Sequence, residues 1–188
     1  IQEQLDSLDS LAAAASRWLN GERDPLFCIN TLSDFLFDEI GFRGNHEDYY
    51  DPRNSLLNAV LSRRLGIPIS LSLIYIEVGR RLGIGLVGIG MPGHFLVRHA
   101  ELTDLFVDPY YGGIILSVEE CAQRLHQLTS ASVQWDPAYL SPIANLDFIA
   151  RMLRNLKATY WRNQDYDRAL RVINWLMALQ PKVGQELR

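Results

Sequence analysis

One histidine and one aspartate stand close enough in this sequence to form a catalytic or ligand-binding pair. His94 follows a Pro-Gly turn, and Asp108 stands fourteen residues later, about the length of one β-hairpin. An imidazole held by a carboxylate acts as the general base in enzymes with a serine or cysteine nucleophile. The same pair also occurs as a satisfied structural contact. From the residues alone, both interpretations stay open.

The candidate nucleophiles for such a pair are Ser70 and Ser72, near the start of a predicted apolar helix. A helix dipole would stabilise a developing alkoxide there, but a serine hydroxyl would still depend on His94 as its base. Ser72 is equally compatible with a small packing residue. Cys28 lies on the apolar stripe of a predicted helix and Cys121 in the first turn of another, so we expect both thiols to be structural.

The elements that must position these residues follow from hydrophobic periodicity and from Gly and Pro punctuation. The predicted helices cover 2–19, 25–40, 52–66, 69–82, 118–128, 141–162 and 165–179, and the short strands cover 86–91, 94–99, 105–108 and 114–116. The helix over 69–82 is apolar on most sides, which predicts a buried central helix. We expect an α+β fold, with a helical N-terminal half, this helix on a small antiparallel sheet, and a C-terminal helical hairpin.

The combination of motifs resembles the transglutaminase-like superfamily, and more narrowly its SirB1-type branch. The runs that carry the resemblance are Asn54-Ser55-Leu56, Gly66 to Ser72, Leu82-Gly83-Ile84, Pro92 to Phe95 and Val107 to Gly113. They are specific in combination, and the resemblance covers about residues 25–181. It implies a papain/transglutaminase-like core, in which that superfamily sets a Cys-His-Asp site with His94 and Asp108 at the last two positions.

The family cysteine has no counterpart here. Counting back from Gly83 places Pro68 at its position. Proline has no thiol, hydroxyl or N–H and cannot attack a carbonyl, although it suits the first turn of a helix. The resemblance therefore implies a degenerate domain that acts as a protein- or peptide-binding, regulatory module. The alternative is an amide-bond hydrolase or acyl transferase that uses His94, Asp108 and a serine nucleophile such as Ser72.

We expect the binding cleft beside His94 to include Asn54, Ser70, Tyr110 and Tyr111, with Tyr49 and Tyr50 as further aromatic walls. Asn54 follows a turn-prone Asp-Pro pair. It either caps the preceding helix or reaches into this cleft, and the sequence does not rank these roles.

The repeat-like C-terminal segment divides the predicted chain into three parts. Residues 1–128 form the transglutaminase-like domain, 129–140 a linker, and 141–188 a tetratricopeptide-like helical hairpin. The positions with that repeat's spacing are Leu156, Tyr160, Ala169, Ile173 and Pro181. Because one repeat cannot bury its own outer face, the hairpin must cap the domain, meet further repeats or bind a partner.

Composition excludes several function classes. The formal net charge is −4, without a basic tail, which argues against nucleic-acid binding. No run approaches the roughly 18 apolar residues of a membrane helix. Two widely separated cysteines favour a reducing compartment, so we expect a cytoplasmic protein.

The run His46-Glu47-Asp48 is a poor metal site, since adjacent residues rarely converge on one ion. We expect neither metal nor cofactor.

Overall fold

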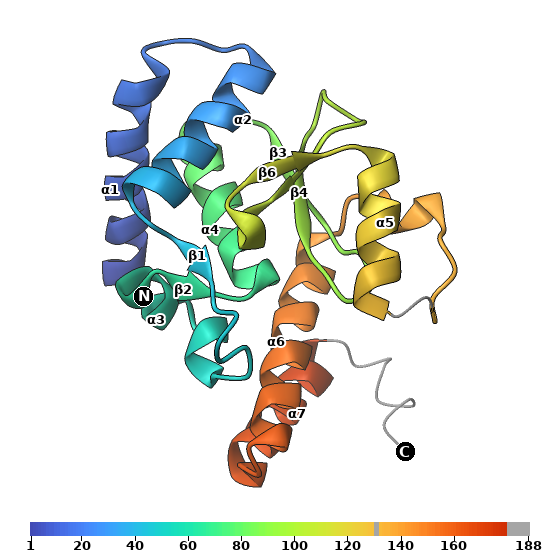
Figure 1. Cartoon of the computed structure of the whole chain (residues 1–188). Coiled ribbons are helices and arrows are strands. Elements are labelled where there is room, and N and C mark those ends of the chain that lie inside the picture. Colours follow the sequence, from blue (N-terminus) through green and yellow to red (C-terminus); the bar gives the residue numbers. More distant parts are fainter. Residues whose placement is uncertain (130–131, 180–188) are drawn as a thin grey trace.

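The structure is a computed structural model that describes residues 1–129 and 132–179. Helices pack against both faces of a small sheet, and a C-terminal helical hairpin extends away from it (Figure 1). The helices and helical turns are α1 (Gln2–Leu19), α2 (Pro25–Ser33), η1 (Asp34–Glu39), η2 (Pro52–Ser55), α3 (Leu57–Arg63), α4 (Pro68–Arg81), η3 (Pro109–Tyr111), α5 (Val118–Thr129), η4 (Pro137–Leu140), α6 (Asn145–Arg162) and α7 (Tyr166–Leu179). The α+β class expected from the sequence is confirmed at this level.

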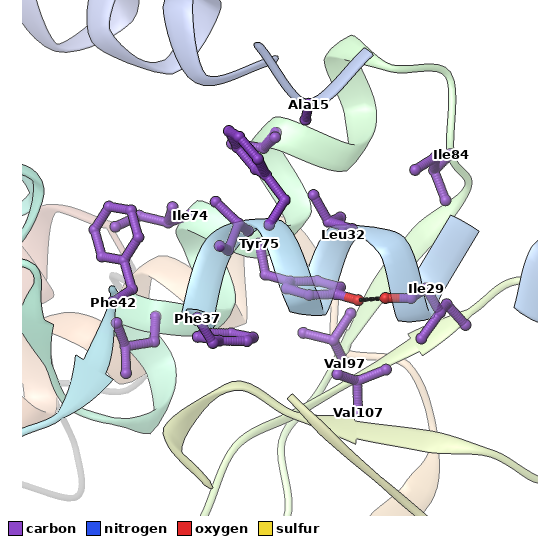
Figure 2. Packing of buried hydrophobic residues seen from close by; sticks show 14 of the residues in the cluster. Ala15, Ile29, Leu32, Phe37, Phe42, Ile74, Tyr75, Ile84, Val97 and Val107 are labelled. Carbon is purple, nitrogen blue, oxygen red and sulfur yellow. Dashed lines mark hydrogen bonds between the residues drawn. The ribbon is translucent and has the colours of Figure 1, made fainter. Parts of the chain in front are cut away.

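Helix α4 is the buried centre of the core, as its continuous apolar character predicts. It packs against α1 on one side and against strands β3 (Leu86–Ile89) and β4 (Leu96–His99) on the other. Tyr75 and Val78 are both completely buried. Figure 2 shows Tyr75 between residues of α2 and the sheet residues Val97 and Val107.

The sheet is an antiparallel meander in the order β3-β4-β5-β6, where β5 is Phe106–Asp108 and β6 is Ile114–Leu116. Val97 of β4 pairs with Val107 of β5, which pairs in turn with Ile115 of β6. Strand β4 begins at Leu96, so His94 lies in the turn before the strand rather than on it. The predicted strand start was wrong by two residues, because the amide of His94 closes the Pro92-Gly93 turn by donating to the carbonyl of Met91 at 3.1 Å.

The predicted helix over 52–66 is interrupted, which corrects the sequence interpretation. Leu56 has an extended backbone between η2 and α3, and Arg64 adopts a left-handed conformation with φ of 58°. The chain then forms β2 (Leu65–Gly66), which pairs in parallel with β1 (Arg43–Gly44). The helix therefore ends three residues early, and residues 65–66 belong to a strand instead.

The helix after Asp24-Pro25 also differs from its prediction. Asp24 caps α2 as expected, because its carboxylate accepts from the amide of Phe27 at 2.8 Å. From Asp34 onward the helix widens into the π-helical segment η1, and Gly41 follows it with φ of 83°.

The C-terminal hairpin begins later than predicted. Pro142 forms a bridge with Ile89, and the amide of Ile143 donates to the carbonyl of Gly88, so this segment extends along β3 instead of starting a helix. Helix α6 therefore starts at Asn145. The helices α6 and α7 enclose a small core of Ala150, Leu156, Tyr160, Ala169, Val172 and Leu176. Pro181 lies outside the described residues.

The hairpin is attached to the core by its own apolar contacts. Phe148 of α6 packs edge-to-face against Phe95, with ring centroids 4.7 Å apart. Ile67 and Ile69 at the start of α4 belong to the same buried cluster. Within the described ranges, no helix is long and apolar enough to cross a membrane.

We expect Tyr75→Phe to lower the free energy of unfolding by about 1–2 kcal/mol, because a buried acceptor loses its donor. The Tyr75 hydroxyl donates to the carbonyl of Ile29 at 2.9 Å and lies 3.1 Å from Ser33 Oγ (Figure 2). Urea denaturation measures the change. Tyr166→Phe is the matched control, because the exposed Tyr166 ring packs against Trp161 without needing its hydroxyl. Equal losses in both variants would contradict the prediction.

Candidate functional site

The predicted pair of His94 and Asp108 forms a direct hydrogen bond. His94 Nε2 lies 2.8 Å from Asp108 Oδ2, and the two residues are 3% and 0% exposed. Asp108 is the last residue of β5 and His94 lies in the turn before β4, so adjacent antiparallel strands bring the two together. This contact between residues fourteen positions apart is the arrangement that the sequence predicts.

The surroundings of Asp108 indicate which ring nitrogen of His94 carries the proton. Asp108 Oδ1 accepts from the amide of Tyr110 at 3.2 Å, and Arg124 Nη1 lies 3.8 Å from Oδ2. A carboxylate with these neighbours accepts from His94, so we assign the proton of the neutral ring to Nε2. Nδ1 is then an acceptor. The pair can bind a donor or take up a proton through this atom.

A cleft of about 520 Å³ opens beside His94. We call it the His94 cleft. Its lining is formed by residues 49–50, 67–69 and 92–95 of the core and by Arg151, Arg154, Asn155, Ala158 and Thr159 of α6. Its walls thus come from the first turn of α4, the histidine turn and the C-terminal hairpin. The volume is within the range of clefts that hold small ligands or part of a peptide.

Arg151 joins the hairpin to the histidine turn. Its guanidinium donates to the carbonyls of Gly90 and His94, both at 2.7 Å, and to that of Met91. The Arg151 guanidinium also lies over the Phe95 ring, at 5.6 Å from the centroid. Burial, with repulsion from Arg154, lowers the pKa of this guanidinium. One side chain of α6 therefore fixes the backbone that carries His94.

An aromatic group surrounds the other side of His94. The rings of Tyr110 and Tyr111 lie 6.1 Å and 6.0 Å from the imidazole. The Tyr110 hydroxyl donates to the carbonyl of Asn45, and burial, with Tyr49 and Tyr111 adding to it, raises the pKa of Tyr110 to about 12. Arg124 stacks over Tyr111 at 4.1 Å. Tyr110 and Tyr111 thus pack behind the imidazole, whereas Tyr49 and Tyr50 line the His94 cleft.

The two serines are not joined to the imidazole. Ser70 Oγ accepts from the amide of Ile67 at 3.0 Å and donates to the carbonyl of Asn54 at 2.6 Å. Ser72 Oγ is completely buried and has no partner among the described residues. Neither hydroxyl makes a hydrogen bond to His94.

Asn54 supports the loop next to the cleft instead of lining it. Its amide donates to the carbonyls of Asp48 and Tyr49 at 2.7 Å and 3.2 Å, and its Oδ1 accepts from Asn45 at 3.1 Å. The side chain is completely buried. It therefore holds the loop from which Tyr49 and Tyr50 reach the His94 cleft.

The two thiols lie in separate buried environments. Cys28 Sγ donates to the carbonyl of Glu22 at 3.7 Å, far from the pair in the fold. Cys121 is 0% exposed among Ile89, Met91 and other residues between the sheet and α5. Burial, with the carboxylates of Asp108 and Glu120 adding to it, raises the pKa of Cys121 to about 12. A reactive cysteine needs the opposite shift.

The sequence interpretation missed the contribution of α6. Arg151, Arg154 and Ala158 follow one another at intervals of three and four residues, which is the spacing of one helix face. Two arginines on one face were the available signal. The local sequence does not indicate which part of the fold this helix face would contact. Among the described residues, no group of three or more His, Cys, Asp and Glu side chains is placed to hold a metal ion.

We expect Arg151→Ala to lower the free energy of unfolding by about 2–4 kcal/mol, since three carbonyls lose a charged donor. Urea denaturation followed by circular dichroism measures this loss. Arg171→Ala on the exposed side of α7 is the control, and we expect it to change stability by less than about 0.5 kcal/mol. An Arg151 variant as stable as the control would show that the three hydrogen bonds do not hold the hairpin.

Comparison with known proteins identifies the family. The model of the transglutaminase-like superfamily matches residues 2–154. A protein of Xylella fastidiosa (strain 9a5c) named UPF0162 protein is 45% identical over 162 residues, covering 84% of this chain and 57% of the relative. A UPF0162 protein of Vibrio cholerae is 30% identical over 169 residues, covering 89% and 62%.

A human relative matches this chain over a smaller share of its own length. F-box only protein 21 is 30% identical over 159 residues, which cover 71% of this chain but 25% of that protein. No solved structure matches the chain. The chain spans about three fifths of the length of the two bacterial relatives described here. Because the family match covers well over half of the 188 residues, the chain belongs to the transglutaminase-like superfamily.

Proposed function

We propose that this domain binds a peptide segment of a partner protein in the His94 cleft and that it does not carry out thiol catalysis. The observation that carries the proposal is that Pro68 and His94 line the same cleft. In the superfamily pattern described above, Pro68 stands where the cysteine nucleophile belongs. The imidazole therefore shares its cleft with a ring that offers neither a nucleophile nor a hydrogen-bond donor.

The packing around Pro68 supports this interpretation. Pro68 is the first residue of α4, and Ser70 closes the N-terminal turn by hydrogen bonding to the amide of Ile67. Proline at this position costs no backbone hydrogen bond, because the first amides of a helix have no intrahelical partner. This packing is what we expect of a helix start at which proline has replaced the nucleophile.

The alternative is an amide-bond hydrolase or acyl transferase with a serine nucleophile, and it has less support. A serine nucleophile should lie within about 3.2 Å of the imidazole nitrogen that accepts its proton, with some looseness in an unliganded enzyme. Ser70 is engaged by the backbone of Ile67 and Asn54, and Ser72 makes no hydrogen bond to His94. A structural position for both serines accounts for these contacts.

We further propose that the α6–α7 hairpin is the tetratricopeptide-like tail of a SirB1-type protein and forms part of the binding surface. Ala169 is buried where the two helices meet, as this repeat requires of a small residue. The hairpin supplies one wall of the His94 cleft. A peptide in the cleft would therefore contact the core and the tail together, as expected of a protein-binding module in the cytoplasm.

Restoring a thiol tests the position of the missing nucleophile. We expect Pro68→Cys to react with iodoacetamide at pH 6 roughly tenfold faster than free cysteine, because a helix N-terminus and an imidazole lower a thiol's pKa. The native Cys28 and Cys121 should stay unmodified in the folded protein, since both are buried. Mass spectrometry of the alkylated protein assigns the site.

The double variant Pro68→Cys with His94→Ala is the control, and it should lose most of the enhanced reactivity. If Pro68→Cys reacts no faster than free cysteine and His94→Ala makes no difference, Pro68 does not occupy a nucleophile position. The proposal of a degenerate thiol site would then be wrong.

Filling the cleft tests the binding proposal. We expect Ala158→Trp to reduce the affinity for peptides selected on the wild-type protein from a random displayed library by roughly tenfold or more, because the indole occupies part of the cleft. Ala158 lines the cleft and is solvent-exposed. Fluorescence anisotropy with the selected peptides measures the loss. Ala13→Trp, an exposed helical alanine on α1, is the matched control and should bind as wild type does.

Two outcomes would contradict the proposal. Equal affinity of Ala158→Trp and Ala13→Trp would place the binding surface outside the His94 cleft. Cleavage or modification of the bound peptides that disappears in His94→Ala would favour the serine hydrolase instead. Mass spectrometry of peptides recovered after prolonged incubation distinguishes retained binding from turnover.

A further inference from the structure

We propose that the His94 cleft selects acidic peptides, with carboxylate side chains that bind along the arginines of α6. This inference rests on the proposed function, because it specifies the chemistry of the peptide that the cleft binds. It is carried by the distribution of charge around the cleft, which differs in sign from that of the whole chain.

The cleft is basic in an acidic protein. The chain has 18 basic and 22 acidic residues, for a net charge of −4. The described residues that line the cleft nevertheless include Arg151 and Arg154 and no aspartate or glutamate. Asp108 lies behind the imidazole and is completely buried. A ligand in the cleft therefore meets positive charge, which attracts anions and repels cations.

Among the described parts of the chain, the hydrogen-bond partners of Arg151 are backbone carbonyls and not carboxylates. Its guanidinium donates to the carbonyls of Gly90, Met91 and His94, which are dipoles without net charge. The electrostatic neighbours that influence it are Tyr49 and Arg154. Hydrogen bonds to neutral acceptors satisfy its donors and hold it in place, while its positive charge remains to act on a ligand in the cleft.

Arg162 extends this positive charge along the helix. Arg162 stands eleven positions after Arg151, which corresponds to about three turns and about 16 Å on the same side of α6. The Arg162 guanidinium lies over the ring of Tyr50, at 4.1 Å from the centroid, and Tyr50 lines the cleft. We call Arg151, Arg154 and Arg162 the arginine track.

The length of the arginine track fits an extended peptide. A strand rises about 3.3 Å per residue, so about 16 Å accommodates roughly five residues with every second side chain on one face. Carboxylates at alternate positions could then approach the track, while apolar side chains meet Pro68 and Ile69 of the first turn of α4. The cleft thus offers charge on one side and apolar surface on the other.

A peptide is favoured over a nucleic acid by the extent of the basic surface. Nucleic-acid binding depends on several phosphate contacts spread over a basic face. The remainder of this chain is acidic, and Glu47 and Asp48 belong to the loop that carries Tyr49 and Tyr50. A long polyanion would meet these carboxylates, whereas a short acidic peptide would stay within the cleft.

The experiment uses the full chain and a fluorescein-labelled peptide of alternating Glu and Ala, with a Gln-for-Glu peptide as the neutral counterpart. We expect Arg154→Gln and Arg162→Gln each to weaken binding of the Glu peptide by roughly fivefold. Arg171→Gln removes the same charge from the exposed side of α7, outside the cleft, and should change the affinity by less than about twofold.

Salt and the peptide series give independent measurements. Raising NaCl from about 0.1 M to about 1 M shortens the screening length from about 10 Å to about 3 Å. We expect this to weaken binding of the Glu peptide far more than binding of the Gln peptide. At low salt, we expect the Glu peptide to bind roughly tenfold tighter than the Gln peptide.

The outcomes separate this inference from the proposed function. If the Gln peptide binds as tightly as the Glu peptide and the Ala158→Trp variant binds neither, the cleft binds peptides but does not select acidic ones. If Ala158→Trp retains the Glu peptide, the cleft is not the binding site and both proposals fail. Equal loss in Arg171→Gln and the track variants, or displacement by a single-stranded oligonucleotide of equal charge, would indicate general anion binding and overturn the acidic-peptide inference.

Discussion

The hydrogen bonds of Arg151 are the interaction on which the arrangement of the site depends. This residue belongs to α6, yet its guanidinium binds three carbonyls of the turn that carries His94. A planar guanidinium with several donors can hold such a turn, which an ammonium group could not do as rigidly. The C-terminal hairpin is thereby a structural part of the site, because it holds the histidine and forms a wall of the cleft at once.

The histidine and aspartate illustrate how a catalytic arrangement can persist in a site proposed to be inactive. The bond between His94 and Asp108 is buried and supported by Tyr110, so breaking it would leave a carboxylate without its partner in the core. Stability alone is a sufficient physical reason to retain the pair. Pro68 likewise suits the first turn of α4. A cleft with this geometry can bind a chain segment without attacking it.

Several elements could be predicted because their signals are local. The periodicity of α1, the Asp24 cap of α2 and the capping box of Ser117 and Glu120 all appear as expected. The errors arose where tertiary contacts prevailed over local patterns. Pro142 and Ile143 extend along β3 instead of opening α6, and Arg64 ends its helix so that β2 can pair with β1. Backbone pairing with a distant strand cannot be derived from periodicity.

The amino-acid sequence by itself determined the class of fold, the spacing that joins His94 to Asp108 and the absence of a thiol at Pro68. These follow from residue type and short-range geometry, which act along the chain. Only the tertiary structure decided that the side chains of Asn54 and Ser70 form hydrogen bonds with backbone groups, and that α6 brings arginines to the cleft. The physical reason is that a side chain's role depends on what lies across from it, and that partner is chosen by packing between distant segments.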